Sequence, residues 1–246
     1  MTDVSRDDCS MLPYKNRTEA GEVLAEQLAA DRFGPEWDRE WDKEQDKSRA
    51  KEQENRPIVL ALPRGGVPVA AVVARKLQAD LDLILVRKLG LPGYEEFAMG
   101  AIASGGVRVL NDAVLSMHRV SAEAIDQVAR KEGDELKRRE SAYRGDRPLP
   151  KLQGRHVILV DDGLATGATM RAAIEVVRRA SPASITLAVP LAPASTLAEM
   201  KTDVDDIVCP ATPEPFRAIG CWYRDFGQTT DKEVQDLLSQ AWQQEH

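Results

Sequence analysis

Residues 156–170 read HVILVDDGLATGATM, an apolar run followed by two acids and a loop of small residues. The apolar part, Val157 to Val160, predicts a strand that is buried on both faces. The residues that follow, RAAIEVVRR at 171–179, have helical spacing. The loop is therefore expected to lie between the carboxyl end of a strand and the N-terminus of a helix.

This loop has the features of a phosphate site. Gly163 and Gly167 let the backbone approach an anion closely, and the helix N-terminus presents unpaired N–H groups and the positive end of a dipole. The hydroxyls of Thr166 and Thr169 can donate to phosphate oxygens. We therefore expect a phosphate to bind here.

The two acids ahead of the loop suit a sugar. Asp161 and Asp162 cannot bind a phosphate, but carboxylates accept hydrogen bonds from the neighbouring hydroxyls of a ribose. Both acids are expected to face the ligand rather than a partner within the protein. The alternative is an ordinary strand–loop–helix turn with solvated acids.

The pattern of apolar strand, two acids and Thr-Gly-x-Thr resembles the phosphoribosyl-pyrophosphate (PRPP) motif of type I phosphoribosyltransferases. A Walker A loop would need a Lys after the glycine, and a dinucleotide site would need GxGxxG spacing; neither is present. ALPRGGVPVA at 61–70 and VRKLGLPGYEEFAMGAIA at 86–103 extend the resemblance to bacterial phosphoribosyltransferases of unassigned substrate. The resemblance implies an α/β fold with a central, mostly parallel sheet flanked by helices and a small C-terminal hood. It also implies that PRPP contacts Asp161, Asp162, Gly163, Leu164, Ala165, Thr166, Gly167, Ala168 and Thr169.

A second anion site is expected at Pro63-Arg64-Gly65-Gly66, between a predicted strand and a predicted helix. The two glycines supply free backbone donors and Arg64 supplies a fixed cation, which together suit a pyrophosphate. The resemblance places the pyrophosphate loop after this same strand. It implies that Arg64 is catalytic and that Arg64, Gly65 and Gly66 bind the pyrophosphate. The alternative is a surface charge on a tight turn.

A strand predicted at 81–86 is followed by Arg87-Lys88, at the edge where ligands collect in open α/β sheets. In the family that the chain resembles, basic residues here reach the pyrophosphate, so Arg87 and Lys88 are expected to be catalytic. The family also implies that a mobile loop, here Leu89 to Phe97, closes over the site and excludes water. The alternative is an Arg–Lys pair in an interface, without a ligand.

The segment 210–230 concentrates aromatic residues and resembles the hood that covers the base in purine-type phosphoribosyltransferases. The resemblance assigns Phe216 to stacking on the base and Ile219 to the base pocket. An aromatic cluster that closes a small domain is the alternative. Hypoxanthine-guanine enzymes have an Asp, their general base, where this chain has Ala165. Glu95 and Glu96 in the predicted loop are candidates for a base from elsewhere, and the alternative is a nucleophile that needs little deprotonation.

The periodicity of the rest of the chain predicts one α/β domain over residues 1–246. A strand–helix–strand order at the start predicts parallel pairing. A hairpin is expected around 97–110, and the helix at 121–144 is expected to lie outside the core. Strands are predicted at 57–62, 81–86, 184–189 and 206–209, and helices at 17–29, 67–77, 121–144, 195–200 and 231–242.

The composition favours a small-molecule ligand. With 33 basic and 40 acidic residues the net charge is −7, so neither nucleic-acid nor membrane binding is indicated. Three separated cysteines without CxxC spacing indicate reduced thiols, and the acidic N-terminus has no apolar leader, so a cytoplasmic protein is expected. The charged segment 35–55 is expected to be an exposed insertion. A partner-binding helix that carries Trp37 and Trp41 is the alternative.

The resemblance implies transfer of the 5-phosphoribosyl group from PRPP to a nitrogenous base, with release of pyrophosphate. Mg²⁺ is expected as the cofactor, held mainly by PRPP and not by protein ligands, because it prefers phosphate oxygens and neutralises the pyrophosphate. A homodimer is expected. The alternative is a non-catalytic PRPP- or nucleotide-sensing regulator, which the missing carboxylate at Ala165 leaves open. The identity of the acceptor base does not follow from the sequence.

Overall fold

The computed structural model describes residues 12–31 and 56–243, so the insertion predicted at 35–55 lies outside the described residues. This part of the chain forms two sheets. The larger sheet is parallel throughout and has the strand order β2-β1-β6-β7-β8, in agreement with the predicted parallel pairing. Its strands are β1 (Ile58–Ala61), β2 (Asp80–Leu83), β6 (His156–Val160), β7 (Ser184–Ala188) and β8 (Asp206–Val208).

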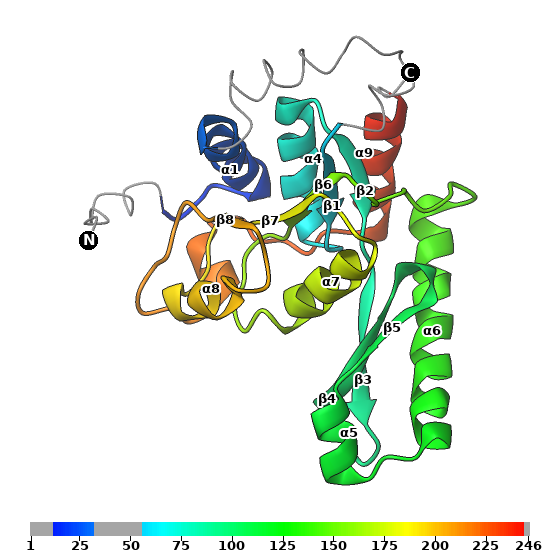
Figure 1. Ribbon diagram of the computed structural model, residues 1–246. Coiled ribbons are helices and arrows are strands. Elements are labelled where there is room, and N and C mark those ends of the chain that lie inside the picture. The colour runs from blue at the N-terminus through cyan, green and yellow to red at the C-terminus, as the bar shows by residue number, and fades with distance from the viewer. Residues whose placement is uncertain (1–11, 32–55, 244–246) are drawn as a thin grey trace.

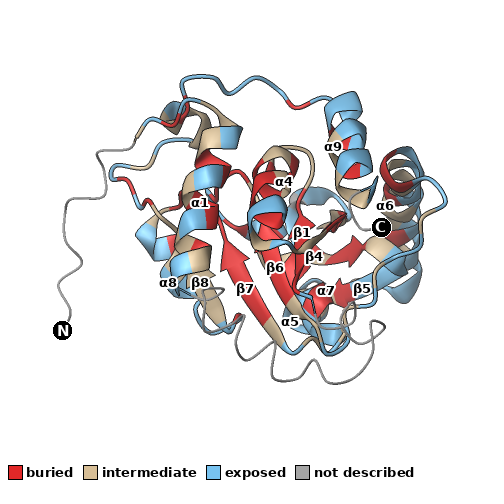
Figure 2. Cartoon of the chain, turned by 90° about the horizontal axis from the view of Figure 1, so that it is seen from above, coloured by how far each residue is buried: buried red, intermediate tan, exposed pale blue. Residues whose placement is uncertain are grey.

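Helices cover both faces of the larger sheet, which explains why its central strands are apolar throughout β1 and at residues 157–160 of β6 (Figures 1 and 2). Alternate residues of a strand point to opposite faces. Val59 and Ile158 belong to one core and Leu60 and Leu159 to the other. The helices around this sheet are α1 (Arg17–Asp31), α4 (Gly66–Leu77) and α9 (Asp231–Gln243), which contribute to the first core, and α7 (Ala168–Arg179) and α8 (Ala194–Met200), which contribute to the second.

The smaller sheet is antiparallel and consists of β3 (Val86–Leu91), β4 (Tyr94–Ala103) and β5 (Val107–Leu110). Two expectations are wrong here. The strand predicted at 81–86 ends at Leu83, because Val86 already belongs to the second sheet. Residues 89–97 are not a long loop, because they form the ends of β3 and β4 on either side of a turn at Pro92-Gly93.

Two glycines of the smaller sheet are positions where two backbones approach closely. A Cβ atom added at Gly90 would lie 2.7 Å from the carbonyl oxygen of Glu95. One added at Gly100 would lie 3.1 Å from the Cα atom of Leu110 on the neighbouring strand. Glycine within a strand often marks such a close approach rather than a break in the strand.

Helix α6 (Ala122–Arg144) follows the short α5 (Asp112–His118) and lies along the smaller sheet (Figure 1). Ser121 caps α6 as predicted, since its hydroxyl accepts a hydrogen bond from the Ala124 N–H at 3.2 Å. The expectation that this helix lies outside the core is wrong, because Leu136 and Tyr143 are buried in the core. In residues 12–31 and 56–243, no helix is both long enough and apolar enough to cross a membrane.

Candidate functional site

The two loops expected to bind anions lie against each other. They follow β1 and β6, which are parallel neighbours, so both loops leave the same edge of the sheet. The Leu62 N–H donates to the Val160 carbonyl oxygen at 2.9 Å. A Cβ atom at Gly65 would collide with the Asp162 carboxylate, 2.7 Å from its Cγ, and one at Gly66 would lie 2.8 Å from the Val160 oxygen. The two glycines are therefore required for the contact between the loops.

The smaller sheet brings a third segment to this edge. The sequence predicts Arg87 and Lys88 at the end of a strand of the larger sheet. In the structure they lie in β3 instead. Both nevertheless line a cavity of about 460 Å³ together with Thr169 of the loop at 161–169. Glu95, a candidate base, lines the same cavity, and the Glu96 side chain lies outside the described residues.

Helix α8 packs against the end of the loop where a phosphate is expected. The Thr196 hydroxyl donates to the Ala165 carbonyl oxygen at 2.8 Å. Gly167 has a φ of 69° and packs so closely against Met200 that no side chain fits there. The side chains at 165, 166, 168 and 169 are exposed. The Leu164 side chain is buried, so this residue can contact a ligand only through its backbone.

The segment expected to be a hood packs over the other end of the loop. A Cβ atom at Gly163 would lie 2.9 Å from Cγ2 of Ile219, which places Ile219 above the residues that follow the two acids. Phe216 is half-buried against a cluster that includes Tyr14 and Tyr223. The Tyr14 N–H donates to the Trp222 carbonyl oxygen at 2.9 Å, so the N-terminal residues are part of this unit. No local pattern in the sequence indicates this pairing of Tyr14 with Trp222.

Asp162 has a buried partner within the protein, so the expectation that both acids face only a ligand is wrong for this residue. The Nε and Nη2 atoms of Arg17 each lie 2.8 Å from Asp162 Oδ2, and the two side chains are only 12% and 11% exposed. Arg17 also donates to the Gly227 carbonyl oxygen at 2.7 Å and lies 4.0 Å from the ring centre of Phe226. The Tyr223 hydroxyl donates to the Asp162 carbonyl oxygen at 2.6 Å.

Asp161 is the acid that lacks this ion pair with Arg17. Burial raises the pKa of its carboxyl well above the ordinary value of 3.8, and the neighbouring Asp162 charge raises it further. The Asp162 N–H donates to Asp161 Oδ1 at 2.8 Å and opposes part of this effect. Asp161 is therefore the stronger candidate for accepting hydrogen bonds from sugar hydroxyls.

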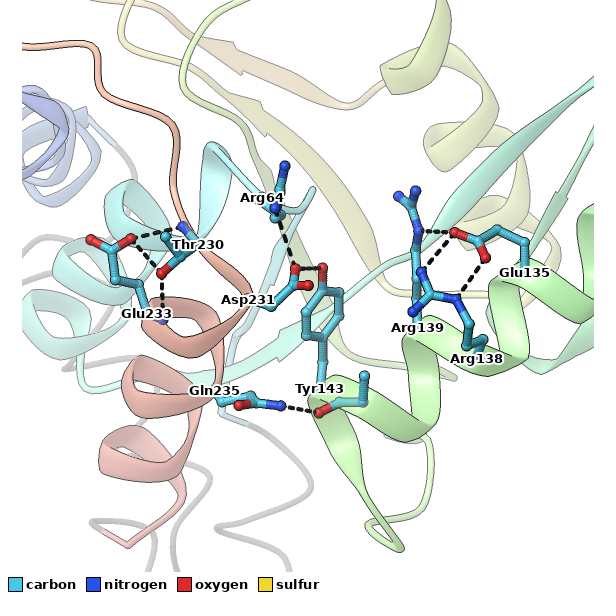
Figure 3. A network of polar contacts seen from close by, with 10 residues as sticks. Arg64, Glu135, Arg138, Arg139, Tyr143, Thr230, Asp231, Glu233 and Gln235 are labelled. Carbon is cyan, nitrogen blue, oxygen red and sulfur yellow. Dashed lines mark hydrogen bonds and ion pairs between the residues drawn. The ribbon is translucent and has the colours of Figure 1, made fainter.

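Arg64 lies in a polar network that joins the PRGG loop to two helices (Figure 3). Its Nη1 atom is 3.5 Å from Oδ1 of Asp231, the first residue of α9, and the Tyr143 hydroxyl of α6 donates to the same oxygen at 2.6 Å. Burial, followed by the hydrogen bond to Asp231, raises the pKa of Tyr143 to about 12. Tyr143 therefore remains protonated and holds Asp231 beside Arg64.

Among residues 12–31 and 56–243 there is no group of three or more His, Cys, Asp or Glu side chains that could hold a metal ion. Asp162 is already paired with Arg17, so of the two acids in this loop Asp161 is the carboxylate left for a metal ion. A metal at this edge would therefore have to bring most of its ligands with the substrate.

Comparisons with known proteins agree with this arrangement. A family model described as a phosphoribosyl transferase domain matches residues 43–220. A candidate phosphoribosyl transferase of Mycobacterium tuberculosis, present in two strains, is 49% identical over 184 residues, which are 75% of this chain and 42% of the relative. The chain thus spans about two fifths of the length of these relatives. The crystal structure of TT1426 from Thermus thermophilus is 38% identical, with a TM-score of 0.77 and a match that covers 92% of this chain and 98% of that one.

Proposed function

Since the chain belongs to the phosphoribosyl transferase domain family and has the type I phosphoribosyltransferase fold, we propose that it transfers the 5-phosphoribosyl group of PRPP to a nitrogenous base. Pyrophosphate is the leaving group. The observation that carries the proposal is the contact of the Gly65-Gly66 backbone with Asp161 and Asp162. This contact supports the proposal because PRPP carries its pyrophosphate on C1 of the ribose, so the segments that bind the two groups have to be adjacent.

Each part of PRPP has a matching segment in this proposal. The 5-phosphate binds at residues 165–169, where the N-terminus of α7 and two threonine hydroxyls supply donors. The ribose hydroxyls donate to Asp161. The pyrophosphate binds the PRGG loop together with Arg87 and Lys88, and its negative charge grows as the bond to C1 breaks. Positive charge held in place beforehand lowers the barrier of such a step.

Mg²⁺ fits this site as part of the substrate, because it prefers phosphate oxygens and keeps several of its waters. Bound there, it would neutralise the pyrophosphate and so assist its departure. In this proposal the chain's own contribution to the metal is at most the Asp161 carboxylate. The arginine and lysine side chains bind the remaining pyrophosphate oxygens.

A screen of nucleobases with PRPP and Mg²⁺ tests the proposed function, with release of pyrophosphate as the signal. We expect release that depends on one base or a small group of related planar bases. Release without any base would indicate hydrolysis of PRPP. Tight PRPP binding without release for any base would favour a sensor over an enzyme.

Replacing Asp161 with asparagine should stabilise the ligand-free protein and weaken PRPP binding. The raised pKa means that the folded protein binds the Asp161 proton more tightly than the unfolded chain, so stability falls as the pH rises above 3.8. An amide carries no charge and avoids this loss at neutral pH, but it accepts hydrogen bonds from hydroxyls less strongly. Thermal unfolding at pH 7 should show a higher melting temperature. Calorimetric titration should show PRPP affinity lower by about tenfold or more.

Asp126→Asn is the control for this experiment, because Asp126 is an exposed acid on α6 that pairs with Arg108. It should change neither measurement. A melting temperature of Asp161→Asn equal to that of the wild type would contradict the argument from burial. Unchanged PRPP affinity would remove Asp161 from the ribose site.

Replacing Phe216 with alanine should weaken binding of the acceptor base by about tenfold and leave PRPP affinity unchanged when no base is present. Phe216 packs in the hood against the cluster that includes Tyr14 and Tyr223. Competition titrations with the base found in the screen measure the first effect. Loss of PRPP affinity instead would show that the Phe216 ring only supports the fold of the hood.

A further inference from the structure

A third arginine reaches the edge of the sheet to which the pyrophosphate is assigned, and the sequence did not indicate it. Arg139 lies on α6 and lines a small cavity of about 30 Å³. The same cavity is lined by Pro63 of the PRGG loop, Arg87 of β3 and Thr169 of the phosphate loop. Arg139 is therefore located where the three segments of the proposed site meet.

The helix itself directs Arg139 toward this cavity. Glu132, Leu136, Arg139 and Tyr143 follow one another at intervals of three or four residues and so share one face of α6. Leu136 and Tyr143 are buried on that face. Figure 3 shows the side chains of Arg139 and Arg64 on either side of Tyr143.

Each of the three arginines has a carboxylate that holds it in place. Arg64 pairs with Asp231, Arg87 donates to Glu132 at 2.8 Å, and Arg139 donates to Glu135 at 2.8 Å. The three guanidinium groups are thus paired with carboxylates before a ligand binds. Hydrogen bonds from Arg138 and Arg139 hold the pKa of Glu135 at about 2, so this carboxylate stays charged.

Arg139 uses only part of its hydrogen-bonding capacity in this pair. Its Nε atom donates to Glu135, whereas its two Nη groups donate to no atom of residues 12–31 and 56–243. The side chain is 37% exposed, so these groups are accessible. A guanidinium held at Nε and open at Nη can donate two parallel hydrogen bonds to a phosphate without breaking its existing bond.

Building on the proposed function, we propose that Arg139 binds the pyrophosphate together with Arg64 and Arg87, and that Glu135 is its positioning residue. The ligand class is a diphosphate, either the leaving group of PRPP or free pyrophosphate. Two phosphate groups carry more acceptor oxygens than the PRGG loop alone can engage. Arginines from the loop, the smaller sheet and α6 surround such an anion from three sides.

Binding of inorganic pyrophosphate in the presence of Mg²⁺ tests this inference by calorimetric titration. Arg139→Gln should weaken binding by about tenfold to a hundredfold, since it removes hydrogen bonds from a charged donor. Arg139→Lys should fall between the wild type and Arg139→Gln, because it keeps the charge but loses the planar pair of donors. The melting temperature of each variant shows that it folds.

Arg138→Gln is a matched control. Arg138 is the adjacent residue, donates to the same Glu135 at 2.8 Å, is 65% exposed and does not line the small cavity. Its replacement should leave pyrophosphate affinity within about twofold of the wild type. Equal weakening by both replacements would show a general effect of charge and overturn the assignment of Arg139.

The result for the wild type separates the inference from the function on which it rests. Wild-type protein that binds PRPP and pyrophosphate, with an Arg139→Gln variant that binds pyrophosphate equally well, would refute the role of Arg139 and leave the proposed function in place. Wild-type protein that binds neither compound would refute the proposed function itself.

Discussion

Replacing Arg17 with alanine should lower the free energy of unfolding by about 3–5 kcal/mol, the range expected when one partner of a buried ion pair is removed. Asp162 would be left as a buried carboxylate without its cation, since its side chain is 11% exposed. The variant would also lose the hydrogen bond to the Gly227 carbonyl oxygen and the contact with the Phe226 ring. Urea denaturation of the ligand-free protein measures the loss.

Two further variants make this result interpretable. Arg171→Ala breaks an ion pair with Glu199 whose side chains are 35% and 66% exposed, and it should cost less than about 1 kcal/mol. Arg17→Ala combined with Asp162→Asn should cost less than the sum of the two single replacements, because the buried charge is removed as well. A loss below 1 kcal/mol for Arg17→Ala alone would show that water solvates the Asp162 carboxylate in place of Arg17.

Replacing Arg64 with alanine should lower kcat by about 10²–10³ and change the KM for PRPP much less, because the charge on pyrophosphate grows as it leaves. Asp231 and Tyr143 hold the Arg64 side chain in place before any substrate binds. Steady-state kinetics with the base identified by the screen provide both constants. The expected loss is the largest of the kinetic effects considered.

Arg108→Ala removes a positive charge of the smaller sheet that pairs with Asp126 of α6, and it should leave both constants unchanged. An effect of Arg64→Ala on KM alone would mean that Arg64 binds PRPP and its transition state equally. In that case the leaving group would have to be stabilised by Arg87, Lys88 or Arg139.

The sequence predicted the features that depend on neighbouring residues. The apolar run before Asp161, the helical spacing after Met170 and the cap at Ser121 are local patterns, and β6, α7 and the cap are found where these patterns predict them. The two glycines of the PRGG loop also carried a local signal, although only the structure shows that they touch the Asp162 carboxylate and the Val160 carbonyl oxygen.

The sequence failed where a residue's role depends on a distant partner. Arg17 and Asp162 are 145 residues apart, and nothing in the first turn of α1 indicates that its charge is buried. Asp231 and Arg139 read as ordinary surface charges, because each lies on a helix rich in such residues. In the sequence Gly90 and Gly100 resemble loop residues, because a close approach of two backbones leaves no trace there.

The contacts of Arg17 also bear on the order in which the protein is made. Arg17 is bonded to Gly227, 210 residues later, and Tyr14 to Trp222. A ribosome delivers Asp161 and Asp162 long before it delivers the segment that encloses them, and contacts between such distant residues form late in folding. The hydrogen bond from the Tyr223 hydroxyl to the Asp162 carbonyl oxygen can therefore form only after residue 223 has been made.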